Sequence, residues 1–152
     1  MLNKIRRARQ LSASEWAALA DAAMALLRAR IRFARVPVQQ LIGDLKARSA
    51  AQPGVDPMHL ADPLQLTRLS WAIGVAAAQV PWRSDCLIQV IAADQMLRRR
   101  GHTADFCLGL RKSEMGTLTA HAWLQCGDVV VTGGAVDGLS VILGPTRLKS
   151  DQ

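Results

Sequence analysis

The spacing of the apolar residues predicts that the first half of the chain is helical. Beyond Ser12, hydrophobic side chains recur at intervals of three and four residues, as they do along one face of a helix. This series comprises Trp16, Leu19, Ala20, Ala23, Met24, Leu27 and Ile31. The segment from Ser12 to Glu15 has the sequence of a capping box, and Pro37 is expected to end the helix.

Two shorter helices are predicted next. One covers residues 38–47, and the other begins at Asp62, where a capping residue precedes a proline, and ends near residue 80. Between them, residues 49–57 (SAAQPGVDP) are rich in turn-forming residues. This stretch predicts a helical extension over residues 1–60 and a core domain over residues 61–150.

The second half of the chain combines one helix with several short strands. Ser84 is the predicted N-cap of a helix over residues 85–100, which is apolar almost all round and is therefore expected inside the domain. Strands are predicted over residues 104–110, 118–126, 129–132 and 139–143, with a hairpin turn at Gly127 and Asp128. The whole pattern predicts an α+β fold: a helical N-terminal half, then one buried helix packed on a small antiparallel sheet.

Composition excludes some classes of protein. Half of the 152 residues are hydrophobic, which is enough for a real core. The net charge of +7 is typical of arginines on solvated helix faces, but it also suits nucleic acid, an anionic membrane or an acidic peptide. Nucleic acid is not expected, since basic and aromatic residues do not alternate. Residues 69–80, the longest apolar stretch, are too short to span a bilayer, and no signal peptide is recognisable.

The three cysteines favour a reducing compartment, the cytoplasm. They cannot all pair with one another, no CxxC is present, and no histidine–cysteine cluster has the spacing of zinc ligands. We therefore expect neither a disulfide scaffold nor a metal site. No glycine-rich phosphate loop is present either, and no cofactor is expected.

Cys86 and His121 are the candidate chemical groups. Cys86 lies at the predicted start of the buried helix, where unpaired backbone N–H groups favour a thiolate. His121 lies on a predicted strand and would serve as a base if the two meet, which would make the protein a cysteine hydrolase or an acyl-transfer enzyme. The alternatives are that Cys86 is a small buried hydrophobe and that His121 is a satisfied residue at a sheet edge. Cys107 and Cys126, on strands, are predicted to be packing residues.

A histidine base normally needs a partner on its second ring nitrogen. With a two-residue turn at Gly127 and Asp128, the hairpin register would place His121 opposite Gly134 and make Thr132 its diagonal neighbour. The nearest acids in the sequence are Asp128 and Asp137.

Residues 82–134 carry a family resemblance. The segment contains the elements CL…LRRRG, LGLRK, HAW and V-x-GG, with Pro81 and Trp82 just before the cysteine. Together these elements resemble the transglutaminase-like domain of lasso-peptide maturation proteins, the leader peptidases encoded with bacterial lasso peptides. The strong part of the match covers about a third of the chain.

The resemblance implies a papain-like cysteine peptidase on a transglutaminase-type fold. Cys86 matches the family nucleophile, and His121 matches the family base. The family aspartate would fall near Gly133, so Thr132, Asp137, a backbone carbonyl or a water is left to orient the histidine. The substrate contacts are predicted to come from Trp82 and Trp123.

The implied function is removal of the leader from a lasso precursor peptide, after which a separate ATP-dependent cyclase closes the ring. The family also implies a leader-recognition protein, and a separate one is expected because the first 80 residues are predicted to be helical. The helices between Ser12 and Leu45 would either bind this protein or simply cover the catalytic core. Two other classes remain: a transglutaminase-type acyl transferase, and a non-catalytic basic binding module.

Overall fold

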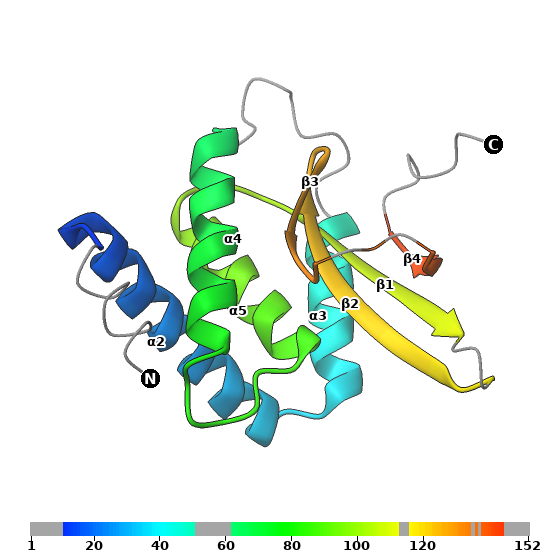
Figure 1. The fold of residues 1–152 in the computed structure, drawn as a ribbon. Coiled ribbons are helices and arrows are strands. Elements are labelled where there is room, and N and C mark those ends of the chain that lie inside the picture. Colours follow the sequence, from blue (N-terminus) through cyan, green and yellow to red (C-terminus); the bar gives the residue numbers. More distant parts are fainter. Residues whose placement is uncertain (1–10, 51–61, 113–115, 135, 137, 145–152) are drawn as a thin grey trace.

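The structure, a computed structural model, describes residues 11–50, 62–112, 116–134, 136 and 138–144. Over these residues the chain forms helices and then a sheet, as predicted (Figure 1). The helices are α2 (Ala13–Arg35), α3 (Val38–Ala50), α4 (Pro63–Ala77) and α5 (Cys86–Arg99). The strands are β1 (Asp105–Lys112), β2 (Leu118–Cys126), β3 (Val129–Thr132) and β4 (Ser140–Leu143). The α+β prediction is confirmed, while the predicted domain boundary at residue 60 lies outside the described residues.

Local capping signals set the starts of α2 and α4. The backbone N–H of Glu15 donates to Ser12 Oγ at 3.3 Å, and the N–H of Ser12 donates to a carboxylate oxygen of Glu15 at 2.7 Å. This reciprocal pair is the predicted capping box. At the start of α4, Asp62 accepts a hydrogen bond from the N–H of Leu64 at 3.0 Å, and Pro63 occupies the first helical position.

The buried face of α2 differs from the predicted one. The structure buries Ala22, Ala25, Leu26 and Ala29, whereas Trp16, Met24 and Ile31 from the predicted apolar series are 52%, 47% and 41% exposed. The helix is apolar around much of its circumference, so periodicity alone did not identify the inner face. Because α2 packs against both α4 and α5, small alanine side chains at the contact let the helices approach closely.

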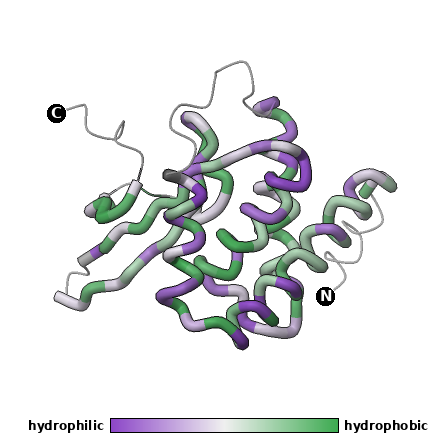
Figure 2. The backbone as a smooth tube through the Cα atoms, turned by 180° about the vertical axis from the view of Figure 1, so that it is seen from behind, coloured by the Kyte–Doolittle hydropathy of each residue, from purple (hydrophilic) through white to green (hydrophobic). Residues whose placement is uncertain are grey.

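Helix α5 lies between the other helices and the sheet. It packs against α2 and α4 and also against β2 and β3. Its buried residues form one continuous core with α2, α4 and the adjacent face of the sheet. Hydrophobic segments (green) occupy the middle of the molecule in Figure 2. The predicted burial of this helix is confirmed.

The sheet is antiparallel, with strand order β3-β2-β1-β4. Ala122 and Leu124 of β2 belong to the core shared with the helices. Because side chains alternate along a strand, His121 and Trp123 project from the other face. Trp123 is nevertheless only 1% exposed, and a Cβ built on Gly109 would lie 3.1 Å from its ring and 3.3 Å from Leu139 Cβ. The chain around β4 therefore covers this second face.

Ion pairs fasten the helices to one another. Arg48 of α3 contacts Asp94 of α5 at 2.7 Å, and Arg98 contacts the same carboxylate at 3.1 Å. Two arginines near the end of α5, Arg99 and Arg100, both reach Asp21 of α2. Part of the positive charge of the chain therefore stabilises the packing of the helices. None of the described helices has the length and apolar character needed to cross a membrane.

Candidate active site

Cys86 is the first residue of α5. The structure makes Asp85 the N-cap in place of the predicted Ser84, since Asp85 has an extended backbone and its carbonyl accepts the hydrogen bond from the N–H of Gln89 at 3.1 Å. Ser84 lies one residue outside the helix, where its carbonyl accepts from Nε2 of Gln89 at 2.8 Å. The helix start is therefore one residue later than predicted, and Cys86 takes the first helical position instead of the second.

The start of α5 is open. The first N–H groups of any helix have no acceptor within the helix, and the Asp85 side chain makes no capping hydrogen bond here. Cys86 is half-buried and packs against the helical core. Within the described part of the chain its thiol forms no hydrogen bond. The sulfur thus lies beside several backbone donors that are available to a bound group.

Two polar side-chain atoms just before Cys86 also lack partners. Nε1 of Trp82 and Oγ of Ser84 are buried and make no hydrogen bond with any residue that the structure describes. The Trp82 ring packs on the helical core and is partly exposed. A buried donor without an acceptor is costly, so this segment can accommodate an additional acceptor.

His121 lies in β2 and is held from two sides. Its Nε2 is 2.7 Å from the carbonyl oxygen of Gly133, and its ring stacks on Trp123 with the centroids 6.3 Å apart and the planes at 17°. Together these contacts restrict the imidazole orientation. The structure therefore brings His121, Trp123 and Gly133 together.

The hairpin register differs from the predicted one. The turn at Gly127 and Asp128 is confirmed, because Cys126 pairs with Val129, but an irregularity then shifts the pairing so that Thr132 lies opposite Leu124. The prediction that His121 faces Gly134 is therefore wrong. The extra residue is a β-bulge, which the alternation of side chains does not reveal.

The shift determines which group meets the histidine. Thr132 is paired with a core residue, and its Oγ1 is buried with no hydrogen-bond partner in the described structure, so it does not hydrogen-bond to His121. Asp137 lies outside the described residues. The contact comes instead from the main chain of Gly133. The two glycines that follow β3 were the sequence signal for a main chain that comes close to a neighbouring side chain.

Cys86 and His121 are not joined by a hydrogen bond, as far as the described residues show. Cys86 packs against the core that includes Ala122, the residue after His121, but the imidazole itself projects from the other face of β2 with Trp123. Of the two tryptophans predicted to contact the substrate, Trp123 is almost completely buried and Trp82 is partly exposed.

The other cysteines are packing residues, as predicted. Cys107 and Cys126 are both buried. Burial, with a smaller contribution from the nearby Asp105, raises the pKa of the Cys107 thiol to about 12. Of the three thiols, that of Cys86 is therefore the accessible one.

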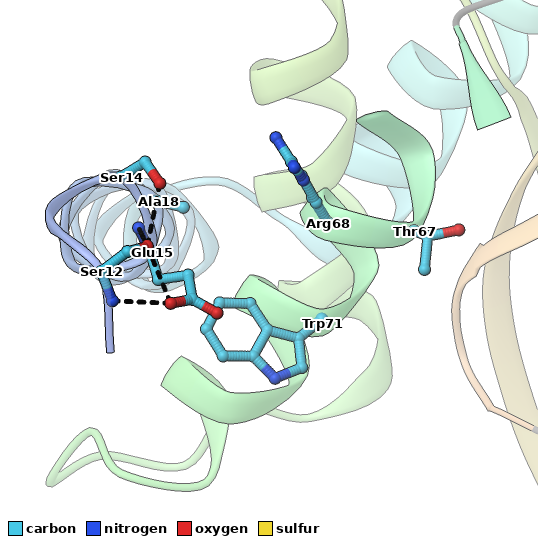
Figure 3. A pocket seen from close by; sticks show the side chains of 7 residues that line it. All are labelled: Ser12, Ser14, Glu15, Ala18, Thr67, Arg68 and Trp71. Carbon is cyan, nitrogen blue, oxygen red and sulfur yellow. Dashed lines mark hydrogen bonds between the residues drawn. The ribbon is translucent and has the colours of Figure 1, made fainter. Parts of the chain in front are cut away.

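A hollow of about 480 Å³ lies between the start of α2 and one side of α4 (Figure 3). It is lined by Ser12, Ser14, Glu15, Ala18, Thr67, Arg68 and Trp71. Neither Cys86 nor His121 belongs to it. No cluster of histidine, cysteine and acidic residues that could hold a metal ion is found among the described residues.

Comparison with known proteins agrees with the fold. A family model described as the transglutaminase-like superfamily matches residues 23–143, which is most of the chain. No curated protein and no solved structure matches. The chain belongs to the transglutaminase-like superfamily.

Proposed function

We propose that this protein is a cysteine peptidase in which Cys86 is the nucleophile and His121 the base. Membership of the superfamily indicates a cysteine peptidase or an acyltransferase-type enzyme. The observation that carries the assignment is the position of Cys86, the one accessible cysteine, at the uncapped start of the buried helix. His121, with its restrained ring, is the candidate base on the strand against which that helix packs.

The reaction has two steps. His121 takes the thiol proton, the sulfur attacks the scissile carbonyl, and the proton passes to the departing amine as the C–N bond breaks. Water then hydrolyses the thioester and restores the thiol. The backbone N–H of Cys86 is the proposed oxyanion donor, and loss of one such donor typically lowers the rate by roughly 10²–10³. The first step requires contact between the imidazole and the sulfur.

The proposed substrate is a lasso precursor peptide, cut at the end of its leader. This assignment rests on the resemblance carried by residues 82–134. By that resemblance, the released core amine passes to a separate ATP-dependent cyclase. A short precursor, a recognition protein and a cyclase are expected among the neighbouring genes.

The proposed binding surface for the recognition protein is the exposed apolar stripe of α2. It consists of Trp16, Ala20, Met24 and Ile31, which recur at helical spacing. Arg28 lies within the stripe and Arg35 follows it on the same face; both are exposed and have no ion-pair partner among the described residues. Such a surface is complementary to an apolar patch with acidic residues.

The stripe is tested by measuring affinity for the recognition protein. Ile31→Gln should weaken binding about tenfold or more, since an anchoring apolar side chain is lost. Ile142→Gln, on the exposed strand β4, is the matched control and should leave binding unchanged. Equal affinities for the two variants would reject the surface.

Leader removal is tested with Cys86→Ala, the precursor and the recognition protein. The variant should release no leader, whereas Cys126→Ala, which removes a buried thiol, should keep the activity if it folds. Leader release by Cys86→Ala at the wild-type rate would refute the proposal. Mass spectrometry separates the alternative, because hydrolysis adds water to the product and acyl transfer joins an amine to it.

A further inference from the structure

The contact between His121 and Gly133 determines the protonation of the imidazole. A carbonyl oxygen can only accept a hydrogen bond. At 2.7 Å, Nε2 of His121 must therefore carry the proton that it donates to the Gly133 oxygen. In the neutral ring this leaves Nδ1 unprotonated and able to take a proton.

Glycine is required at position 133 for this contact. Its φ is +107°, a conformation that L-residues with a side chain rarely adopt. A Cβ at this position would lie 2.5 Å from Trp123 Cβ and 3.1 Å from Nε2 of His121. Any side chain would therefore push the main chain away from the two rings.

We propose that the main-chain carbonyl of Gly133 orients His121 in place of a carboxylate, so that Nδ1 is the atom that receives the thiol proton. This inference rests on the proposed peptidase function. In a Cys–His–acid arrangement, the third group holds the tautomer and the ring direction and stabilises the imidazolium that forms. The Gly133 carbonyl performs the first two tasks, and its dipole contributes to the third, since a hydrogen bond from a charged donor is stronger than one from a neutral donor. Gly133 is thus a positioning residue.

Gly133→Ala tests the proposal, and Gly134→Ala is its matched control. Gly134 also has a positive φ, of +64°, but a Cβ there would meet no atom of the described residues within 4 Å. Both variants thus carry backbone strain, and only the first displaces the carbonyl. Peptidase activity should fall on the order of 10²-fold for Gly133→Ala, as expected for a misplaced catalytic group, and only about twofold for the control.

The deciding measurement is the tautomer of His121, read from long-range ¹H–¹⁵N correlations at a pH where the ring is neutral. The wild-type protein should show protonated Nε2 and bare Nδ1, the control should show the same, and Gly133→Ala should show both tautomers. His121→Gln identifies the signal. A wild-type ring protonated at Nδ1, or a folded Gly133→Ala variant with an unchanged tautomer, would overturn the proposal. If Gly133→Ala does not fold, the wild-type tautomer decides. If the tautomers are as expected but Cys86→Ala is active, the proposed peptidase function is refuted. The role of the Gly133 carbonyl in orienting His121 would still stand.

Discussion

Arg48 and Asp94 join α3 to α5 through a 2.7 Å contact, and the carboxylate is only 8% exposed. Arg98 is the second partner of that carboxylate, so the charge of Asp94 is matched from two helices. Because α5 begins with Cys86, this pair helps to hold the helix that carries the proposed nucleophile. It also explains how a nearly buried acid is tolerated in an apolar core.

Arg48→Met should lower the free energy of unfolding by about 1–3 kcal/mol, because it leaves a buried carboxylate with one partner fewer. The double variant Arg48→Met, Asp94→Leu should recover part of the loss, since no buried carboxylate remains and Arg98, which loses its partner, is 45% exposed to water. Urea unfolding measures both. Arg83→Met, which breaks an exposed pair with Asp85, is the control and should change the value by less than about 0.5 kcal/mol. Equal effects at the two sites would contradict the structural role of Arg48.

Alkylation by iodoacetamide tests the Cys–His pair without any substrate. Cys86 should react before the two buried thiols, and His121→Ala should slow its reaction at pH 6.5 by about tenfold, because the imidazole is the proposed acceptor of the thiol proton. Peptide mass mapping identifies the modified residue. Identical rates with and without His121 would show that the imidazole does not act on this thiol.

The structure confirms most of the predictions that depend on local signals, the exception being the N-cap of α5, which is Asp85 and not Ser84. The capping box at Ser12, the Asp62–Pro63 helix start and the turn at Gly127 each involve only a few neighbouring residues, and each was predicted correctly. The buried helix α5 could also be predicted, because it is apolar on nearly every side.

Features that depend on tertiary packing could not be predicted in this way. Periodicity did not show that α2 would turn its alanines inward, since that choice depends on how closely α4 and α5 approach. The shift in β3 depends on one extra residue, and it moved Thr132 into the core and brought Gly133 to His121. The sequence named both candidate catalytic residues but did not determine what orients the base.

Cys107 should make stability depend on alkaline pH. Its pKa is raised from 9.0 to about 12 in the folded protein, so between these values the unfolded chain releases a proton that the folded chain retains. The contribution is fully present below pH 9 and is lost as the pH rises toward 12. Unfolding free energies of the wild type and Cys107→Ala should therefore converge between pH 8 and pH 10.5. A constant difference across this range would exclude the effect.

Substitution of alanine for Gly109 and for Gly74 should change the stability of the protein in opposite directions. At Gly109 a Cβ would lie 3.1 Å from the Trp123 ring and 3.2 Å from the Ser140 carbonyl oxygen, so Gly109→Ala should destabilise the protein by about 1–3 kcal/mol. At Gly74, on the exposed side of α4, an added Cβ would meet no atom of the surrounding described residues within 4 Å, and Gly74→Ala should stabilise the protein by about 0.5–1 kcal/mol. Thermal unfolding measures both. Destabilisation by Gly74→Ala would contradict the open surface.

The hydrogen bond between Gly133 and His121 has a consequence for how such sites are recognised. Its acceptor is an atom that every amino acid possesses, so a survey that looks for an acidic residue at this position would classify the protein as lacking a third group. Replacing side chains one at a time would also misattribute the effect, since glycine has none to remove. Insertion or deletion of a single residue in β3 would disrupt this contact most directly, because the length of the strand determines which peptide unit lies beside the imidazole.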